Sequence, residues 1–288
     1  ELRRADYGFA TGRFDEAFVT YDQFYGSNAM AAKQHSINNY CSMLFNRQAY
    51  AKSRQCYLNL ASMLNVTSAI GSAHYLATLA EMKAGELSAS PEIEFGTIAD
   101  RFPGTAAALL AEMKQADFCA LNQDECAENA GQWFRRITGR SSARALSESA
   151  TFKEALVAFL DGRYSMSIEL LQKMLRTYQS GTLQEQAQAL LIQLIPDEIE
   201  RLLDAGLDIE AIALAQQNRT FFEKGWLDES LLFQIGLAFE RLTMHSEALQ
   251  LFLYLRNRST VLDEESLLFA TIRAAHALGS YYLVEDLA

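Results

Sequence analysis

Several kinds of feature are scarce in this 288-residue chain, and each shortage narrows the range of folds and partners that the protein can have. There are only 3 prolines, which favours helices. Runs of alternating β-branched residues are missing, so the sequence offers little from which to build a sheet. Basic residues are outnumbered, with 25 lysines and arginines against 36 acidic residues and a formal net charge of -11. Because that balance repels a phosphate backbone, we expect no nucleic-acid partner.

Cysteine is scarce as well, with 4 residues in the whole chain. Cys119 and Cys126 flank an expected turn, so opposed helix ends could bring them together. Cys41 and Cys56 fall in expected helices with no obvious facing geometry. Free cysteine is among the residues most often buried, so we expect buried free thiols rather than disulfides.

Long apolar runs of the kind that span membranes are also missing. The longest uncharged stretch, residues 59–80, has the length of a membrane span, but it contains Asn65, Ser68 and His74 and two turn-like breaks. We interpret it as a helix end, a turn and the start of the next helix. We therefore expect no transmembrane segment in this sequence.

What the chain does contain is a repeat of small residues about every 36 to 44 positions. The small residues are Ala17, Ser53, Ser90, Ala127, Ser167, Ala211 and Ala248. Each follows an expected turn position by five residues, and these turn positions are Gly12, Gln48, Gly85, Asn122, Gly162, Gly206 and Thr243. Half of the residues are apolar and good helix formers are abundant, which favours helices on both sides of each turn.

The unit around Thr243 shows the pattern most clearly. Leu232, Gly236 and their neighbours form one helical stripe before the turn, and Ala248 and Phe252 lie on another after it. Small residues at Gly236 and Ala248 would let two antiparallel helices approach closely. This pattern resembles the tetratricopeptide repeat, a helical hairpin of about 34 residues. The likeness is degenerate, because Leu232 replaces the family's tryptophan and Thr243 replaces its turn glycine.

The resemblance implies an all-α fold, a right-handed α-solenoid of about seven to eight antiparallel helical hairpins. Repeats one to four would occupy residues 1–134, with the first truncated, and repeats five to eight residues 147–288, with the last truncated. Between them, residues 135–146 lose helical patterning and predict a basic loop. A second irregularity is Pro196, which should end one helix and begin another that runs to Ala205.

In the tetratricopeptide family, the first helix of each hairpin lines a concave surface that binds partners. Mapping those positions onto this chain gives the candidate partner-binding residues Phe45, Tyr75, Phe152, Phe159, Phe233 and Phe269. Aromatic anchors of this kind would suit an apolar helix or extended segment of a partner protein. The alternative is that the rings pack against the neighbouring repeat. The family's clamp for a terminal carboxylate is rejected, because no basic residue accompanies Asn39, which is read as a polar surface residue.

One basic cluster stands out in this acidic chain. Its members are Arg135, Arg136, Arg140 and Arg144. The cluster could dock an acidic partner or a lipid headgroup. The alternative is a solvated loop, since runs of surface charge usually have no further role.

No motif in the sequence carries chemistry. The four histidines are far apart and none has a partner at the helical spacing of a metal site. There is also no phosphate-binding glycine loop and no nucleophile elbow. We therefore expect no enzyme activity, no cofactor and no metal.

The functional prediction is a non-catalytic scaffold or adaptor that binds a protein or peptide partner. The alternatives are a repeat module of a larger enzyme, regulator or transporter-associated lipoprotein, and an envelope component that self-associates through its repeat ends. Residues 98–120 resemble repeats common in bacterial envelope and lipoprotein families. That resemblance favours a periplasmic or membrane-associated location in a bacterium over a cytoplasmic one.

Overall fold

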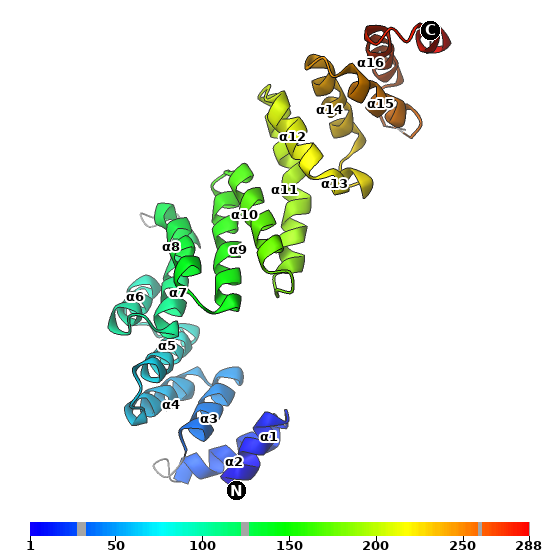
Figure 1. The fold of residues 1–288 in the computed structure, drawn as a ribbon. Coiled ribbons are helices and arrows are strands. Elements are labelled where there is room, and N and C mark those ends of the chain that lie inside the picture. The colour runs from blue at the N-terminus through cyan, green and yellow to red at the C-terminus, as the bar shows by residue number, and fades with distance from the viewer. Residues whose placement is uncertain (28–32, 122–126, 259–260, 288) are drawn as a thin grey trace. The chain divides into compact units, whose positions relative to one another are not determined.

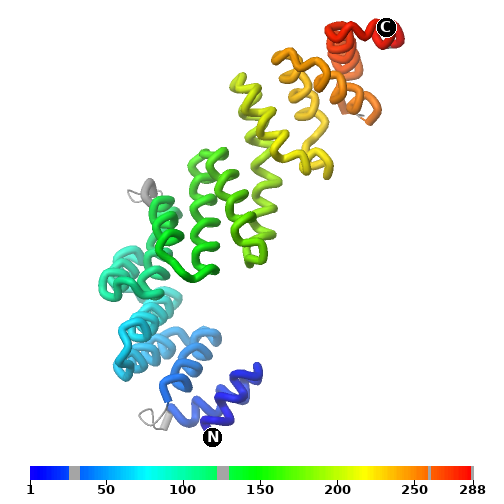
Figure 2. The backbone as a smooth tube through the Cα atoms, viewed as in Figure 1, coloured from blue at the N-terminus to red at the C-terminus, as the bar shows by residue number. Residues whose placement is uncertain are grey.

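The protein is built from α-helices that follow one another along the chain. The computed structural model describes residues 1–27, 33–121, 127–258 and 261–287, and these ranges contain no strand (Figure 1). The chain divides into two compact units, Glu1–Val157 and Ala158–Ala288. The expected all-α fold is therefore confirmed. Within each unit, consecutive helices pack on one another, and the backbone doubles back at each turn (Figure 2).

The helices of the described residues fall into two sets, one for each unit. The helices that begin in the first unit are α1 (Leu2–Ala10), α2 (Phe14–Ser27), α3 (Gln34–Asn46), α4 (Tyr50–Met63), α5 (Thr67–Ala84), α6 (Pro91–Arg101), α7 (Ala106–Leu121), α8 (Ala127–Arg140) and α9 (Arg144–Leu160). Those of the second unit are α10 (Tyr164–Thr177), α11 (Gln184–Asp204), α12 (Asp208–Gln217), α13 (Arg219–Glu223), α14 (Glu229–Arg241), α15 (His245–Arg256), α16 (Glu264–Ala277) and α17 (Tyr281–Leu287).

The turn positions share one backbone geometry. A left-handed φ is found at the expected turn positions Gly12, Gln48, Gly85, Gly162, Gly206 and Thr243, with values from 59° at Thr243 to 79° at Gly12, and also at Gly279. At Gly162 the amide donates to the carbonyl of Phe159 at 2.9 Å. The next amide, of Arg163, donates to Ala158 at 2.8 Å, which completes the six-residue helix-ending motif. Asn122, the remaining expected turn position, lies outside the described residues.

The small residues after these turns lie where two helices touch. Ala17, Ser53, Ser167, Ala211 and Ala248 are at most 1% exposed. The side chain of Ala127 lies outside the described part of the chain. Ser90 is the exception and corrects the prediction, because it is exposed and lies just before the start of α6 at Pro91. The loop after Gly85 is longer than at the other turns, so five residues do not reach the second helix.

The hairpin of α14 and α15 has the interior expected from its sequence. Ile235, Phe252 and Leu255 are at most 4% exposed. A Cβ atom built on Gly236 would lie only 2.4 Å from the Phe252 ring. The close approach of the two helices therefore depends on glycine at this position.

The uncharged stretch is divided as predicted. Helix α4 ends at Met63 and α5 begins at Thr67, so residues 59–80 form a helix end, a connection and a second helix. Of the helices in the described ranges, none is both long enough and apolar enough to cross a membrane.

The predicted break at Pro196 is wrong, because α11 runs through it from Gln184 to Asp204. Proline in a helix interior costs about 3 kcal/mol through a lost hydrogen bond and a clash with the preceding turn. Ile195 and Ile199 are fully buried, as is Glu198. Burial of apolar side chains at about 1.5 to 3 kcal/mol each on both sides of the proline offsets its cost, so both halves stay in one helix.

The predicted basic loop at residues 135–146 is also wrong. Helix α8 continues to Arg140, and α9 begins at Arg144, so only a short connection remains. Phe134 and Ile137 are at most 1% exposed and pack in one apolar cluster with Ala150. Burial of this face holds the segment helical despite Gly139, because tertiary packing outweighs local propensity.

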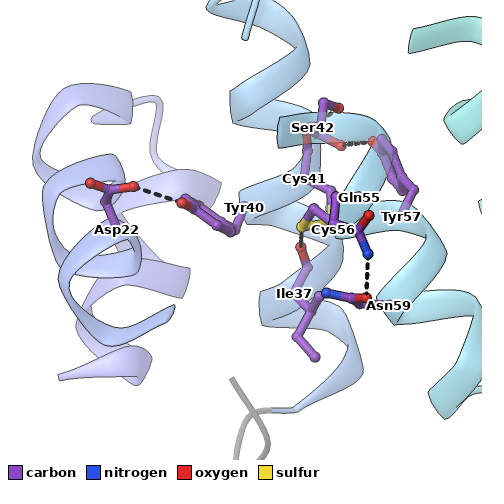
Figure 3. Close-up of a disulfide and its surroundings, with 10 residues drawn as sticks. Asp22, Ile37, Tyr40, Cys41, Ser42, Gln55, Cys56, Tyr57 and Asn59 are labelled. Atoms are coloured by element: carbon purple, nitrogen blue, oxygen red, sulfur yellow. Dashed lines mark hydrogen bonds between the residues drawn. A yellow bond between two sulfur atoms is a disulfide. The ribbon is translucent and has the colours of Figure 1, made fainter. Parts of the chain in front are cut away.

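The expectation of free thiols is wrong for the described cysteines. Cys41 on α3 and Cys56 on α4 form a disulfide, with their Cα atoms 5.4 Å apart (Figure 3). Antiparallel helices place residues at equal distances from the turn opposite one another, and these two lie seven before and eight after Gln48. Cys119 is disulfide-bonded as well. Cys126 lies outside the described residues.

Candidate protein-binding site

The six aromatic candidates do not form one exposed stripe. Tyr75 is 7% exposed and packs in the core with Phe95, their ring centroids 5.8 Å apart. Burial raises the pKa of the Tyr75 phenol to about 12. Phe269 is the opposite case, with 54% of its surface exposed. Core packing therefore accounts for Tyr75, while Phe269 is open to solvent.

The other four rings are half-buried. Three of them contact an aromatic residue of their own unit, with centroids 5.3 to 5.8 Å apart: Phe45 on Tyr50, Phe159 on Tyr164 and Phe233 on Phe252. Such pairs contribute to stability beyond simple burial. These rings support their own hairpins and leave only part of their surface for a partner. Phe152 is half-buried, and no such ring pair involves it among the residues that the structure describes.

The basic cluster is partly neutralised. Arg135 on α8 donates to the buried carboxylate of Glu154 at 2.8 Å. Arg140 Nη1 donates to both carboxylate oxygens of Glu112, at 3.0 and 2.9 Å. The partner carboxylates come from α9 and α7, the helices that follow and precede α8 in the chain.

The remaining two arginines, Arg136 and Arg144, are exposed. Within the described part of the chain neither forms an ion pair, so the predicted docking by this cluster would depend on these two side chains. Arg136 also borders a small recess of about 410 Å³ that includes Trp133 and the carboxylates of Asp100 and Glu112.

A groove opens in the first unit beside α3 and α5, and we call it the α3–α5 groove. Its volume is about 360 Å³, and its lining is Gln34, His35, Asn38, Leu60, Leu64, Ala69, Ser72, Ala73 and Leu76. Its floor is apolar, whereas its rim is polar and comes from α3 and α5. His35, Asn38 and Ser72 occupy the helix positions that the tetratricopeptide resemblance assigns to the concave surface. These three residues are not among the six aromatic candidates.

A hydrogen-bonded network centred on Asp6 of α1 lies beside this groove. The Asp6 carboxylate accepts from Tyr21 at 2.6 Å and from Ser36 at 2.9 Å, and His35 Nε2 lies 3.0 Å away. Burial alone would raise the pKa of Asp6, but the hydrogen bonds from Tyr21, Ser36 and His35 outweigh it and lower the pKa. Asn39 donates to the Tyr21 hydroxyl at 3.3 Å, so it belongs to this network and is not a free surface residue.

The network contains serine, histidine and aspartate but does not form a catalytic triad. A triad needs the carboxylate on one ring nitrogen of histidine and the nucleophile on the other. Here His35 Nε2 faces both Asp6, at 3.0 Å, and Ser36, at 3.3 Å. Ser36 also donates to the carboxylate itself. The geometry holds α1, α2 and α3 together and does not activate Ser36.

Neither a metal site nor a comparison with known proteins identifies the function of this chain. Within the described residues, no group of three or more histidine, cysteine, aspartate or glutamate side chains gathers to hold a metal ion. No protein-family model matches the chain, and no curated protein matches it in sequence. The fold and its surfaces define a class, an all-helical protein of successively packed helices with an open groove.

Proposed function

We propose that this protein is a non-catalytic interaction scaffold built from tetratricopeptide-like hairpins stacked into a right-handed α-solenoid. The α3–α5 groove binds an extended segment of a partner protein. The observation that carries the proposal is the groove itself, lined mainly by α3 and α5, the first helices of successive hairpins, and completed by Leu60 and Leu64. The recurring left-handed turns and buried small residues support a repeat architecture.

The groove has the chemistry of a peptide site. Leu60 and Leu76 give an apolar floor for one partner side chain. Asn38 on the rim is exposed, and its amide can both donate to and accept from a peptide backbone. At about 360 Å³ the groove lies near the lower end of ligand-site volumes, so it holds one or two side chains of a longer segment.

Filling the groove should abolish peptide binding without unfolding the chain. Ser72 is exposed at the rim, so Ser72→Trp places a large ring in the groove and leaves the core unchanged. Peptides selected from a random display library on the wild-type protein should bind Ser72→Trp at least tenfold more weakly in a calorimetric titration. Ser62→Trp is the matched control, because Ser62 is exposed on α4 and does not line the groove.

Two results would contradict the proposal. One is a selection that enriches no peptide on the wild-type protein. The other is equal affinity of the selected peptides for Ser72→Trp and the wild type, with Ser62→Trp unchanged. A circular-dichroism melt of both variants shows whether any loss comes from unfolding.

The disulfides bear on where the scaffold works. Disulfides persist in oxidising compartments and are rare in the cytosol. The Cys41–Cys56 bond and the bonded Cys119 therefore favour the periplasmic or membrane-associated location over the cytoplasmic one.

Self-association is the second candidate function, favoured by exposed aromatic residues on α16 and α17. Phe269 is 54% exposed, Tyr281 61% and Tyr282 92%. If these rings join two copies, light scattering should show a mass that rises with protein concentration. Phe269→Ser together with Tyr282→Ser should then keep the protein monomeric. A wild-type monomer at every concentration would exclude self-association.

A further inference from the structure

A second pocket lies in the unit Ala158–Ala288, where the repeat pattern is interrupted. The short helix α13 is inserted between α12 and α14. After it, Gly225 adopts a φ of 70°, and the Trp226 amide donates back to the Phe221 carbonyl at 2.9 Å. This turn brings the Trp226 ring onto Phe221, with centroids 4.9 Å apart. The result is a pocket of about 560 Å³ bordered by α10, α11, the end of α12 and α13. We call it the α13 pocket.

The α13 pocket has an apolar wall. Phe221 is 7% exposed, and Trp226 stands edge-on to it. Leu191 and Ile192 of α11 continue this surface. An apolar or aromatic group of a ligand can therefore be buried against this wall.

The pocket also has a fixed polar surface. Asn218, 9% exposed, accepts from Gln172 at 3.0 Å and donates to the Leu214 carbonyl at 2.8 Å. Two further amides, of Gln188 and Gln217, line the pocket and are exposed. These amides make no hydrogen bond within the described part of the chain, so they can contact a polar ligand.

The charge of the pocket is opposite to that of the protein. Its lining includes two cations, Arg176 and Lys224, and no carboxylate, although the chain has a net charge of -11. The nearest acidic residue in sequence, Glu223, pairs with Arg219 at 3.2 Å instead. Lys224 lies 4.5 Å from the centre of the Trp226 ring, so this cation stands beside the apolar wall. Arg176 forms no ion pair among the described residues.

The geometry points to a binding site for an organic carboxylate joined to an apolar body. The carboxylate contacts Arg176 and Lys224, the apolar body lies against Phe221 and Trp226, and the amides orient the rest of the ligand. A peptide that ends in an apolar residue and a small aromatic acid share this chemistry. The function is distinct from that of the α3–α5 groove, which belongs to the other unit.

The fluorescence emission of Trp226, which lines the α13 pocket, reports ligand binding directly. The chain has 2 tryptophans, so Trp133→Phe leaves Trp226 as the sole reporter. The probes are 3-phenylpropionate and the peptide acetyl-Ala-Phe with a free carboxylate. The binding of each acid is compared with that of its carboxamide. We expect a saturable change in emission with at least one acid, and at least tenfold weaker binding of the corresponding amide.

Charge-removing variants test the assigned cations. Arg176→Gln together with Lys224→Gln should weaken binding of the acid at least tenfold. Lys173→Gln is the matched control, because Lys173 is exposed on α10 and does not line the pocket. Calorimetry on the chain with both tryptophans, and melts of every variant, separate a binding loss from a folding loss.

Each outcome decides the question. Binding of the peptide acid alone supports a chain terminus as the ligand, and binding of phenylpropionate alone supports a small acid. The inference is overturned if neither acid binds at millimolar concentration, if acid and amide bind equally, or if the double variant matches Lys173→Gln. None of these results depends on the α3–α5 groove.

Discussion

Removing the disulfide between Cys41 and Cys56 should lower the free energy of unfolding of the unit Glu1–Val157 by about 3 kcal/mol. The bond closes a loop with a sequence separation of 15, and a cross-link over a loop of this length stabilises by about 3 kcal/mol, mainly by constraining the unfolded chain. The variant is Cys41→Ala with Cys56→Ala. Urea unfolding followed by circular dichroism, with hydrogen exchange to locate the effect in α3 and α4, measures the loss.

Two controls show whether the loss of stability comes from the Cys41–Cys56 bond. Peptide mapping without reductant should recover Cys41 and Cys56 in one linked species. Reductant should weaken the Cys119→Ala variant, which keeps the α3–α4 bond, but should no longer act on α3 and α4 in the double alanine variant. If the double variant and the oxidised wild type unfold at the same urea concentration, the bond contributes nothing to stability.

The same pair shows how far the sequence could be read. The period predicts a turn at Gln48, and the structure gives this residue a left-handed φ of 62°. Once that turn is placed, the two helices must run antiparallel. Cys41 and Cys56 are then almost equally distant from it, so the signal for the disulfide was present. The expectation that the two cysteines have no facing geometry overlooks this nearly equal distance from the turn.

The wrong predictions at Pro196 and at residues 135–146 have a different cause. In both cases a local signal, a proline or a group of glycine and serine residues, is outweighed by burial of the segment against other helices. Ile137, for example, packs with Ala150 of α9, a neighbour that no local pattern identifies. Local chemistry predicts turns well when backbone geometry decides, as at Gly162, and poorly when tertiary packing decides.

The candidate sites show the same division. The repeat predicts which positions of each hairpin's first helix face the concave surface. Three of these positions, His35, Asn38 and Ser72, line the α3–α5 groove. The repeat does not predict which of those positions are exposed to solvent. Tyr75, for example, lies in the core. The α13 pocket was beyond prediction, because it depends on a five-residue helix that interrupts the repeat.

Gly236→Ala should destabilise the unit Ala158–Ala288 by about 1 to 3 kcal/mol, although alanine is the better helix former. In an open helix the change gains about 1 kcal/mol. Here the new Cβ atom would lie 2.4 Å from Phe252 Cε1, and Phe252 is fully buried, so its ring has no free space into which to move. Overpacking of a filled core costs about 1 to 3 kcal/mol, and larger side chains at this position should cost more. Urea unfolding of the variant measures the difference.

Gly139→Ala is the matched control, because Gly139 also lies in a helix and a Cβ atom there would meet nothing within 4 Å. It should leave stability unchanged or raise it by up to about 1 kcal/mol. Combining Gly236→Ala with Phe252→Leu tests the cause, since a smaller side chain should absorb the clash. The two changes together should then cost less than the sum of their separate effects, by about 0.5 to 3 kcal/mol. Strict additivity would show that Gly236 is not needed for the close approach of α14 and α15.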